Sequence, residues 1–250
     1  MSLVLRVSDA RKIYGPGCPA CAEQGDVEQA HCARCDSVVA LAGLSFELHK
    51  GEILGVMGES GSGKSTLVRL INMDEAPSSG EARFIDGGTE LDLFRLNAAE
   101  QRRVRSQKLG VVYQRPELGL NFRFSAGGNI AERLLAADFS DYGGIRARAC
   151  ALLERTGLPE ARMDELPGGF SGGMQQRVQI AKALAPCPRL LLLDELTTGL
   201  DVSVQARILD LILELQEELA LSMIVVTHDL GVIRLLAGRT LVMRAGRVVE

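Results

Sequence analysis

Short apolar runs alternate along this chain with segments in which apolar residues recur at helical spacing. Runs of strand length occupy residues 3–8, 44–49, 52–57, 80–86, 109–113, 190–193 and 221–226. Helical spacing covers residues 66–71, 97–107, 127–137, 145–155, 170–185 and 202–218. Residues 241–244 and 248–250 predict a closing antiparallel hairpin around Ala245 and Gly246. Strands that alternate with helices predict an α/β protein with a mainly parallel sheet.

Two of these helical segments predict a small helical lobe inside one large domain. Residues 127–137 and 145–155 are amphipathic and are separated by a polar, glycine-containing stretch at 138–144. We expect a single domain over residues 1–250, with the lobe inserted at about 115–180. Before the lobe, Asn97 followed by Glu100 is a variant of the capping box that begins many helices.

Composition and charge narrow the class of protein. The 250 residues are 46% hydrophobic and 24% charged, and the net charge of −4 with a pI of about 5.6 provides no basic field for nucleic acid. The N-terminus lacks the pattern of a signal peptide, and no apolar run reaches the roughly 20 residues of a membrane helix. The sequence predicts a cytoplasmic protein, with docking at the periphery of the inner membrane left open.

Residues 58–66 fit the phosphate-binding pattern G-x-x-x-x-G-K-S/T between a predicted strand and a predicted helix. Glycines let backbone amides converge on phosphate oxygens, and the helix N-terminus attracts anions. We expect Lys64 to reach the β- and γ-phosphates and Ser65 to bind Mg²⁺. A glycine-rich turn without ligand is the alternative, which this context disfavours. The predicted nucleotide-binding residues of the loop are Gly58, Glu59, Ser60, Gly61, Ser62, Gly63, Lys64, Ser65 and Thr66.

A second half of a nucleotide site follows the apolar run 190–193. Asp194 stands at the carboxyl end of that predicted strand, where α/β sheets bind ligands, and its carboxylate suits Mg²⁺. Glu195 is next and can orient or deprotonate a water that attacks the γ-phosphate. The alternative is a solvated pair of acids at a strand end.

Residues 15–37 form a cysteine-rich insertion. It contains two C-x-x-C pairs separated by ten residues: Cys18, Cys21, Cys32 and Cys35. Two such knuckles resemble a zinc ribbon, in which each pair gives two thiolates to one Zn²⁺. Four free surface thiols and an iron–sulfur cluster are the alternatives. His31 is interpreted as a bystander.

Residues 170–177, Phe-Ser-Gly-Gly-Met-Gln-Gln-Arg, resemble the signature motif of the ATPase subunits of the ABC superfamily. Further matches follow in the order of that family: Tyr14 for the aromatic that stacks on adenine, Gln114 for the Q-loop, residues 199–201 with Asp201 for the D-loop, and His228 for the switch histidine. The resemblance implies a P-loop NTPase of ABC type, with a mainly parallel sheet core, an antiparallel β subdomain and an inserted helical lobe.

The resemblance also implies how the site is completed. Two copies form a head-to-tail homodimer around two ATP·Mg²⁺, and each site receives the partner's signature residues Ser171, Gly172, Gly173 and Gln175. Ligands of Mg²⁺ are Ser65, Gln114 and Asp194. Catalytic roles fall to Lys64, Gln114, Glu195 and His228. No role for nucleic acid follows.

Two subfamilies share the finer resemblance. Residues 58–66 and 198–206 are similar to ATPases of peptide and nickel importers. Residues 124–134, 142–146 and 227–237 resemble the ABC-type subunit of the bacterial carbon–phosphorus lyase system, which degrades phosphonates. The latter implies docking on a lyase core complex, and the alternative is a motor on a membrane permease. An assembly module without turnover is a third possibility, which the intact Glu195 and His228 disfavour.

Three features depart from the family pattern. Leu196 stands where a proline usually follows the catalytic glutamate, which is expected to loosen that turn. The cysteine insertion is longer than the hairpin of many members, and the resemblance puts it near the adenine end of the site. Relatives usually continue beyond the position of Glu250, so C-terminal docking contacts stay open.

Overall fold

The computed structural model describes residues 2–23, 30–197 and 200–250. The chain forms two compact units. One comprises the residues up to Gln101 together with Ser222–Glu250, and the other comprises Arg102–Leu221. The two units are described in turn.

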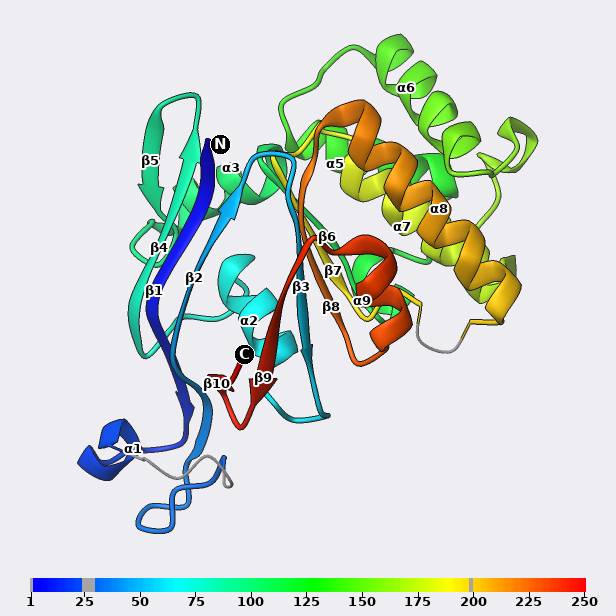
Figure 1. Ribbon diagram of the computed structural model, residues 1–250. Coiled ribbons are helices and arrows are strands. Elements are labelled where there is room, and N and C mark those ends of the chain that lie inside the picture. Colours follow the sequence, from blue (N-terminus) through cyan, green and yellow to red (C-terminus); the bar gives the residue numbers. More distant parts are fainter. Residues whose placement is uncertain (1, 24–29, 198–199) are drawn as a thin grey trace. The chain divides into compact units, whose positions relative to one another are not determined.

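The first unit contains an antiparallel sheet with the strand order β2-β1-β4-β5. Its strands are β1 (Leu3–Tyr14), β2 (Val38–His49), β4 (Ser79–Asp86) and β5 (Thr89–Asp92). This sheet is the antiparallel β subdomain expected for the fold. The first two strands are longer than predicted, because a register shift between Val7 and Ala10, with Asp9 at φ 48°, interrupts the alternation that marks a strand in sequence. Their far ends lead into the cysteine insertion with α1 (Pro19–Glu23) (Figure 1).

The same unit holds a second group of strands in the order β10-β9-β3-β8. The parallel members are β3 (Ile53–Gly58), β8 (Ser222–Thr227) and β9 (Arg239–Arg244), and β10 (Arg247–Val248) closes the predicted hairpin antiparallel to β9. Helix α2 (Lys64–Ile71) follows β3. Helix α9 (Leu230–Leu236), which the sequence pattern did not reveal, packs on β3, where a side chain on Gly55 would meet Ile233.

The second unit combines two parallel strands with the helical lobe. Strands β6 (Leu109–Val112) and β7 (Leu190–Asp194) pair in parallel, from Leu109 with Leu190 to Val112 with Leu193. The helices are α4 (Pro116–Gly119), α5 (Ala126–Ala136), α6 (Tyr142–Arg155), α7 (Gly172–Leu184) and α8 (Val202–Leu219), with short 3-10 turns at Glu160–Arg162 and Pro167–Gly169. Buried side chains that include Ile130, Leu134, Leu153 and Val178 form the core of the lobe. The predicted lobe of two amphipathic helices is therefore present, with α7 as a third partner.

Helix α3 (Ala98–Gln107) begins with the predicted capping box. The Asn97 side-chain oxygen accepts from the amides of Ala99 and Glu100, and the Glu100 carboxylate accepts from the Asn97 amide at 2.9 Å. These reciprocal bonds satisfy amides that the helix itself leaves unpaired.

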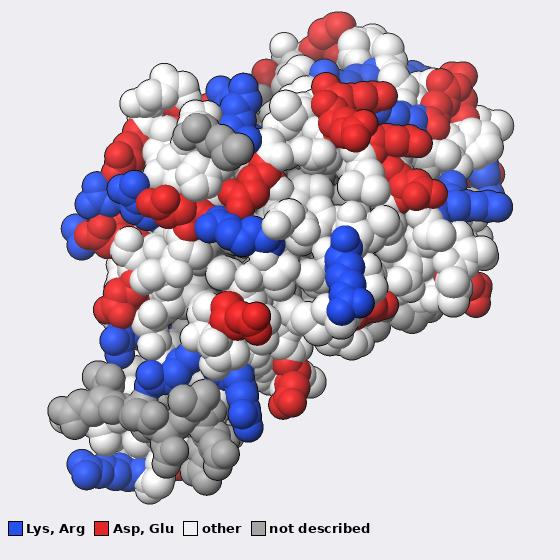
Figure 2. Space-filling view, in the orientation of Figure 1, with Lys and Arg blue, Asp and Glu red and all other residues white. Residues whose placement is uncertain are grey.

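Two surface properties bear on the kinds of partner that were considered. In the part of the chain that the structure describes, no helix is both long enough and apolar enough to cross a membrane. On the face shown in Figure 2, acidic and basic side chains are interspersed and do not gather into one broad basic area. Electrostatic attraction of a polyanion has no obvious basis on this face.

Candidate active site

The phosphate loop has backbone conformations and close contacts that only glycine accommodates easily. Gly61 and Gly63 have φ values of +79° and +102°, a region that other residues avoid. A Cβ on Gly63 would strike the carbonyl oxygen of Ala40, and one on Gly58 would strike that of Met243. On Gly61 a Cβ would meet nothing within 4 Å. The loop is therefore packed against the protein on one side and open at Gly61.

The N-terminus of α2 is suited to bind an anion. Its N-cap, Gly63, provides no side-chain hydrogen bond, and no acidic residue lies in its first turn. The Lys64 ammonium is buried and donates to the carbonyl oxygens of Gly58 and Glu59, at 2.8 Å each. The buried Ser62 hydroxyl has no hydrogen-bond partner among the described residues. Amides, a positive helix end and a lysine fixed across the loop fit a polyphosphate.

Tyr14 lies beside the same helix end. It is the last residue of β1, its hydroxyl donates to the Glu75 carboxylate at 2.5 Å, and it is also hydrogen-bonded to the side chain of Thr66. Burial and the bond to Glu75 raise the pKa of Tyr14 above 10.0. The Lys12 ammonium lies 5.0 Å from the ring centroid. The predicted adenine platform and the predicted phosphate loop are thus brought together within the first unit.

His228 also lies at this edge. It directly follows β8, whose last residue, Thr227, is in register with Met57 of β3, one residue before the loop. Its side chain is exposed, and the next residue, Asp229, caps α9 by accepting from the amide of Gly231 at 2.7 Å. The parallel register therefore places His228 and the phosphate loop at the carboxyl ends of adjacent strands.

In the second unit, β6 and β7 bring the Q-loop residue and the acids together. Val112 and Leu193 are in register, so Gln114 and Glu195 emerge just beyond the ends of paired strands. The Gln114 amide donates to the Glu195 carboxylate at 3.0 Å. Glu195 is half-buried at φ 48°, and Asp194 before it is buried. An amide that orients a carboxylate at a strand end is suited to position a water.

The turn after Glu195 is packed rather than exposed. Leu196, which replaces the family's proline, is 5% exposed, so its side chain anchors the segment through burial. Asp201 is exposed at the N-cap of α8 and makes no capping hydrogen bond with its side chain. Gly199, the first residue of the proposed D-loop, lies outside the described residues, as does Thr198.

The signature residues open α7. The Ser171 hydroxyl accepts from the Met174 amide at 3.4 Å, and the Gln175 amide donates to the carbonyls of Pro167 and Phe170. Ser171 and Gly172 are exposed in the single chain. Gly173 is buried, and a Cβ there would meet the Val204 side chain at 2.6 Å. Close packing of α7 on α8 is thus a separate reason for glycine at this position.

One functional residue was missed by sequence reasoning. Gln179 on α7 is 1% exposed, and its side-chain amide both accepts from the Tyr113 amide at 2.8 Å and donates to the Tyr113 carbonyl at 3.1 Å. These bonds hold the backbone directly before Gln114. The available signal was a pair of glutamines, Gln176 and Gln179, on the buried face of α7.

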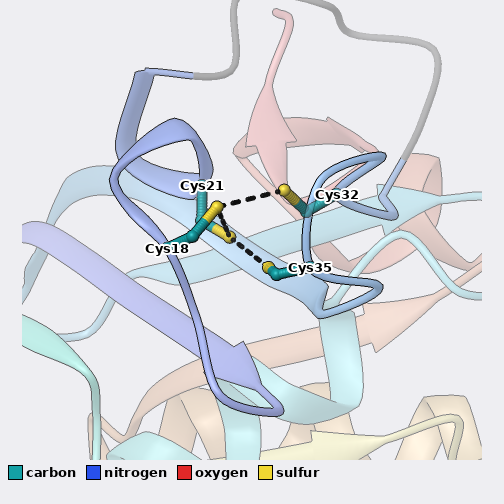
Figure 3. A group of neighbouring side chains, drawn as sticks. All are labelled: Cys18, Cys21, Cys32 and Cys35. Carbon is teal, nitrogen blue, oxygen red and sulfur yellow. Dashed lines mark hydrogen bonds between the residues drawn. The ribbon is translucent and has the colours of Figure 1, made fainter.

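The four cysteines of the insertion form one cluster in the first unit (Figure 3). Their sulfur atoms all lie within 4.8 Å of one another, and the thiols are not paired in disulfides. Hydrogen bonding with the Ser37 hydroxyl and amide lowers the pKa of the Cys35 thiol to about 6. The sequence prediction that these four residues come together is confirmed, whereas the bound metal stays a prediction.

The phosphate loop, the carboxylate–glutamine pair and the signature helix together define an ATPase of the ABC class. The ABC transporter family model matches residues 41–198, and the chain belongs to this family. The predicted family, fold class and ATPase activity are thereby confirmed.

Particular relatives add detail. The chain is 51% identical over 207 residues to the putative phosphonates utilization ATP-binding protein PhnK of Escherichia coli K12, covering 83% of this chain and 81% of that protein. It is 42% identical over 219 residues to the oligopeptide transport ATP-binding protein OppD of Bacillus subtilis, covering 85% of this chain and 60% of that one.

Among solved structures, the dimeric ATP-binding cassette MJ0796 in a post-hydrolysis state with ADP and Pi has a TM-score of 0.82 and 29% identity. The match covers 98% of this chain and 97% of the MJ0796 chain. The roles of the individual site residues remain predictions.

Proposed function

We propose that this chain is the ATPase of a phosphonate-degrading carbon–phosphorus lyase system and works as an ATP-driven homodimer docked on the lyase core. The observation that carries the proposal is the 51% identity to a phosphonates utilization protein over 81% of that protein's length. The peptide-transport ATPases reach 38–44%. Of these, the two matched at 44% are spanned over only 34% of their length.

The chemistry is assigned to the chain's own groups. Lys64 and the loop amides balance charge on the transferred phosphoryl group, and His228 contacts the γ-phosphate. Glu195 accepts a proton from the attacking water while Gln114 holds that carboxylate in place. A hydroxyl, an amide oxygen and a carboxylate suit a hard cation, so Ser65, Gln114 and Asp194 would hold Mg²⁺. When bound, Mg²⁺ neutralises phosphate charge.

Dimerisation is proposed from the exposed signature residues. Ser171 and Gly172 are accessible in the single chain, and the amides at this helix start have an orientation that favours an anion. The related cassette MJ0796 is described as dimeric with ADP and Pi. Two copies in head-to-tail arrangement would let phosphate charge bridge the two surfaces, with Asp201 at the same junction. Closure would then depend on ATP and reverse after hydrolysis.

A pocket in the helical lobe is the proposed docking site for the lyase core. It measures about 440 Å³ and is lined by α5 and α6 together with Met163 and Asp164. Most of its lining comes from residues 124–134 and 142–146, the segments that resemble the carbon–phosphorus lyase subunit. Among its lining residues, Leu135 and Tyr142 are 58% and 76% exposed, so both side chains are available to a partner.

The test uses the organism that encodes the chain. Deleting the gene should abolish growth on methylphosphonate as sole phosphorus source, wild type should restore it, and Glu195→Gln should not. Labelled methylphosphonate should still enter the deletion strain. Growth of that strain on methylphosphonate would overturn the proposal.

Loss of uptake would instead favour the second candidate, a motor on an importer for peptides, nickel or phosphonates. That candidate rests on the identity to OppD.

The docking pocket is tested by the Leu135→Asp variant, with Leu118→Asp, also at an exposed position, as a matched control. Only the change at Leu135 should prevent co-purification with lyase subunits.

A further inference from the structure

The cysteine cluster is independent of the nucleotide machinery and is assembled from two separate turns. Cys18 and Cys21 belong to the turn that starts α1, and Cys32 and Cys35 belong to the turn that leads into β2. The measured sulfur–sulfur distances are 3.8 Å for Cys18 to Cys21, 3.6 Å for Cys18 to Cys32 and 3.4 Å for Cys21 to Cys35. The two contacts between the pairs are therefore shorter than the contact within the first pair.

These distances fit three of the six edges of one small tetrahedron, and the other three sulfur pairs lie within 4.8 Å. Four thiolates at the usual Zn–S length of about 2.3 Å would be separated by about 3.8 Å along each edge of a tetrahedron. The three measured distances lie within 0.4 Å of that edge. A single four-coordinate ion can therefore occupy the centre with little movement of the side chains.

The surroundings hold the thiols in this arrangement. Cys21 and Cys32 are each 2% exposed, and they pack with the apolar side chains of Ile13 and Val39. Backbone bonds fix both segments: the Cys21 amide donates to the Cys18 carbonyl at 2.9 Å, and the Cys32 amide donates at 2.8 Å to the carbonyl of Ser37, two residues beyond the second pair. A site whose ligands are buried and fixed by backbone bonds is typical of structural metals.

Hydrogen bonds to the sulfur atoms add a second layer. The amides of Arg34 and Cys35 hydrogen-bond the Cys32 sulfur. The Ser37 hydroxyl accepts from the Gly17 amide at 3.0 Å and lies 3.2 Å from the Cys35 sulfur. Groups that orient the ligands of a metal are a usual part of such sites.

Two other uses of the same thiols fit less well. A disulfide requires sulfur atoms about 2.05 Å apart, whereas these are separated by 3.4–3.8 Å in a connected set of four. In a [4Fe–4S] cluster each thiolate binds a different iron, which spreads the sulfurs beyond the edge of a single-ion tetrahedron.

We propose that Cys18, Cys21, Cys32 and Cys35 bind one structural Zn²⁺ that ties the end of β1 to the beginning of β2. Cys18 lies four residues beyond Tyr14, and Cys35 lies three residues before Val38, the residue paired with Tyr14 in the sheet. The ion would close the insertion directly beside this last pair of the hairpin and restrict the motion of Tyr14.

The test is metal analysis of the full chain, purified without an affinity tag that binds metal. Wild type should contain one zinc per chain, and Cys18→Ser and Cys32→Ser should lose most of it. Cys187→Ser is the matched control, because it removes a free cysteine outside the cluster and should keep the zinc. Cobalt added to metal-free wild type should produce the absorption of tetrahedral cobalt thiolate.

A second measurement uses wild type alone and so does not depend on whether the variants fold. In wild type, four thiols should become reactive only after a zinc chelator is added. Substoichiometric zinc in the wild type, equal zinc in all variants, iron with acid-labile sulfide, or disulfides in protein prepared without oxygen would each overturn the site. All of these readouts are independent of phosphonate metabolism and of ATP turnover.

Discussion

Replacing Gly63 by alanine separates two physical costs in the phosphate loop. Alanine in the left-handed region costs about 1–2 kcal/mol at either Gly63 or Gly87, where φ is +102° and +58°. At Gly87 a Cβ meets nothing within 4 Å, so this strain is the whole cost. At Gly63 the same atom also strikes the carbonyl oxygen of Ala40 and comes within 3.1 Å of the Leu41 side chain.

The second cost arises because a backbone carbonyl cannot rotate away like a side chain. Overpacking of this kind typically costs a further 1–3 kcal/mol. Gly63→Ala should therefore destabilise the protein by about 2–5 kcal/mol, and Gly87→Ala by about 1–2 kcal/mol. Shifting Gly63 also moves the start of α2, so only this variant should lose affinity for ATP.

Urea unfolding without nucleotide measures the first effect, and titration with a fluorescent ATP analogue measures the second. Gly61→Ala provides a further control, since it has a positive φ inside the loop but free space around the added atom. Its stability should match that of Gly87→Ala. If Gly63→Ala unfolds at the same urea concentration as these two controls, the close packing described for the loop is not what holds it in place.

Three further predictions concern the site and the insertion. Glu195→Gln should retain ATP and accumulate as a dimer while turnover falls by a factor of about 10²–10⁴, and turnover like that of wild type would contradict the role of the carboxylate. Tyr14→Ala should weaken ATP binding by about 1–3 kcal/mol, as expected for loss of stacking, whereas Tyr14→Phe keeps the ring and should bind normally; equal weakening in both would show that the hydroxyl, not the ring, matters. Removing zinc with a chelator should lower the melting temperature of wild type and of Cys187→Ser alike but not that of Cys18→Ser, and an unchanged melting temperature in wild type would exclude a stabilising ion.

The local sequence pattern was sufficient to predict those parts of the site whose residues are close together in the sequence. The strand, loop and helix around Lys64 are contiguous, so the glycines and the apolar runs on both sides identify them directly. The same holds for Asp194 at the end of four leucines, and for the cysteine pairs, whose short spacing predicts that each pair shares a turn. Such features need no knowledge of the rest of the chain.

Features that depend on contacts between distant parts of the chain were harder to predict from the sequence. The second half of β1 exists because it pairs with Val38–Ala42 across an irregular register, and no period of two marks it in sequence. Helix α9 is only seven residues long and depends on its Asp229 cap. Gln179 reads as an ordinary polar residue until its two bonds to the backbone of Tyr113 are seen. The strand and the glutamine depend on partners distant in the sequence, whereas α9 is too short to show a helical period.

The bonds from the Lys64 ammonium to its own loop have a consequence for mutagenesis. This cation donates to two carbonyl oxygens of its own loop, those of Gly58 and Glu59. Truncating it to alanine would remove one donor from each oxygen, of which that of Glu59 also accepts from the Ser62 amide at 3.1 Å, as well as removing a phosphate contact. A Lys64→Ala variant would therefore report the integrity of the phosphate loop as well as its affinity for ATP.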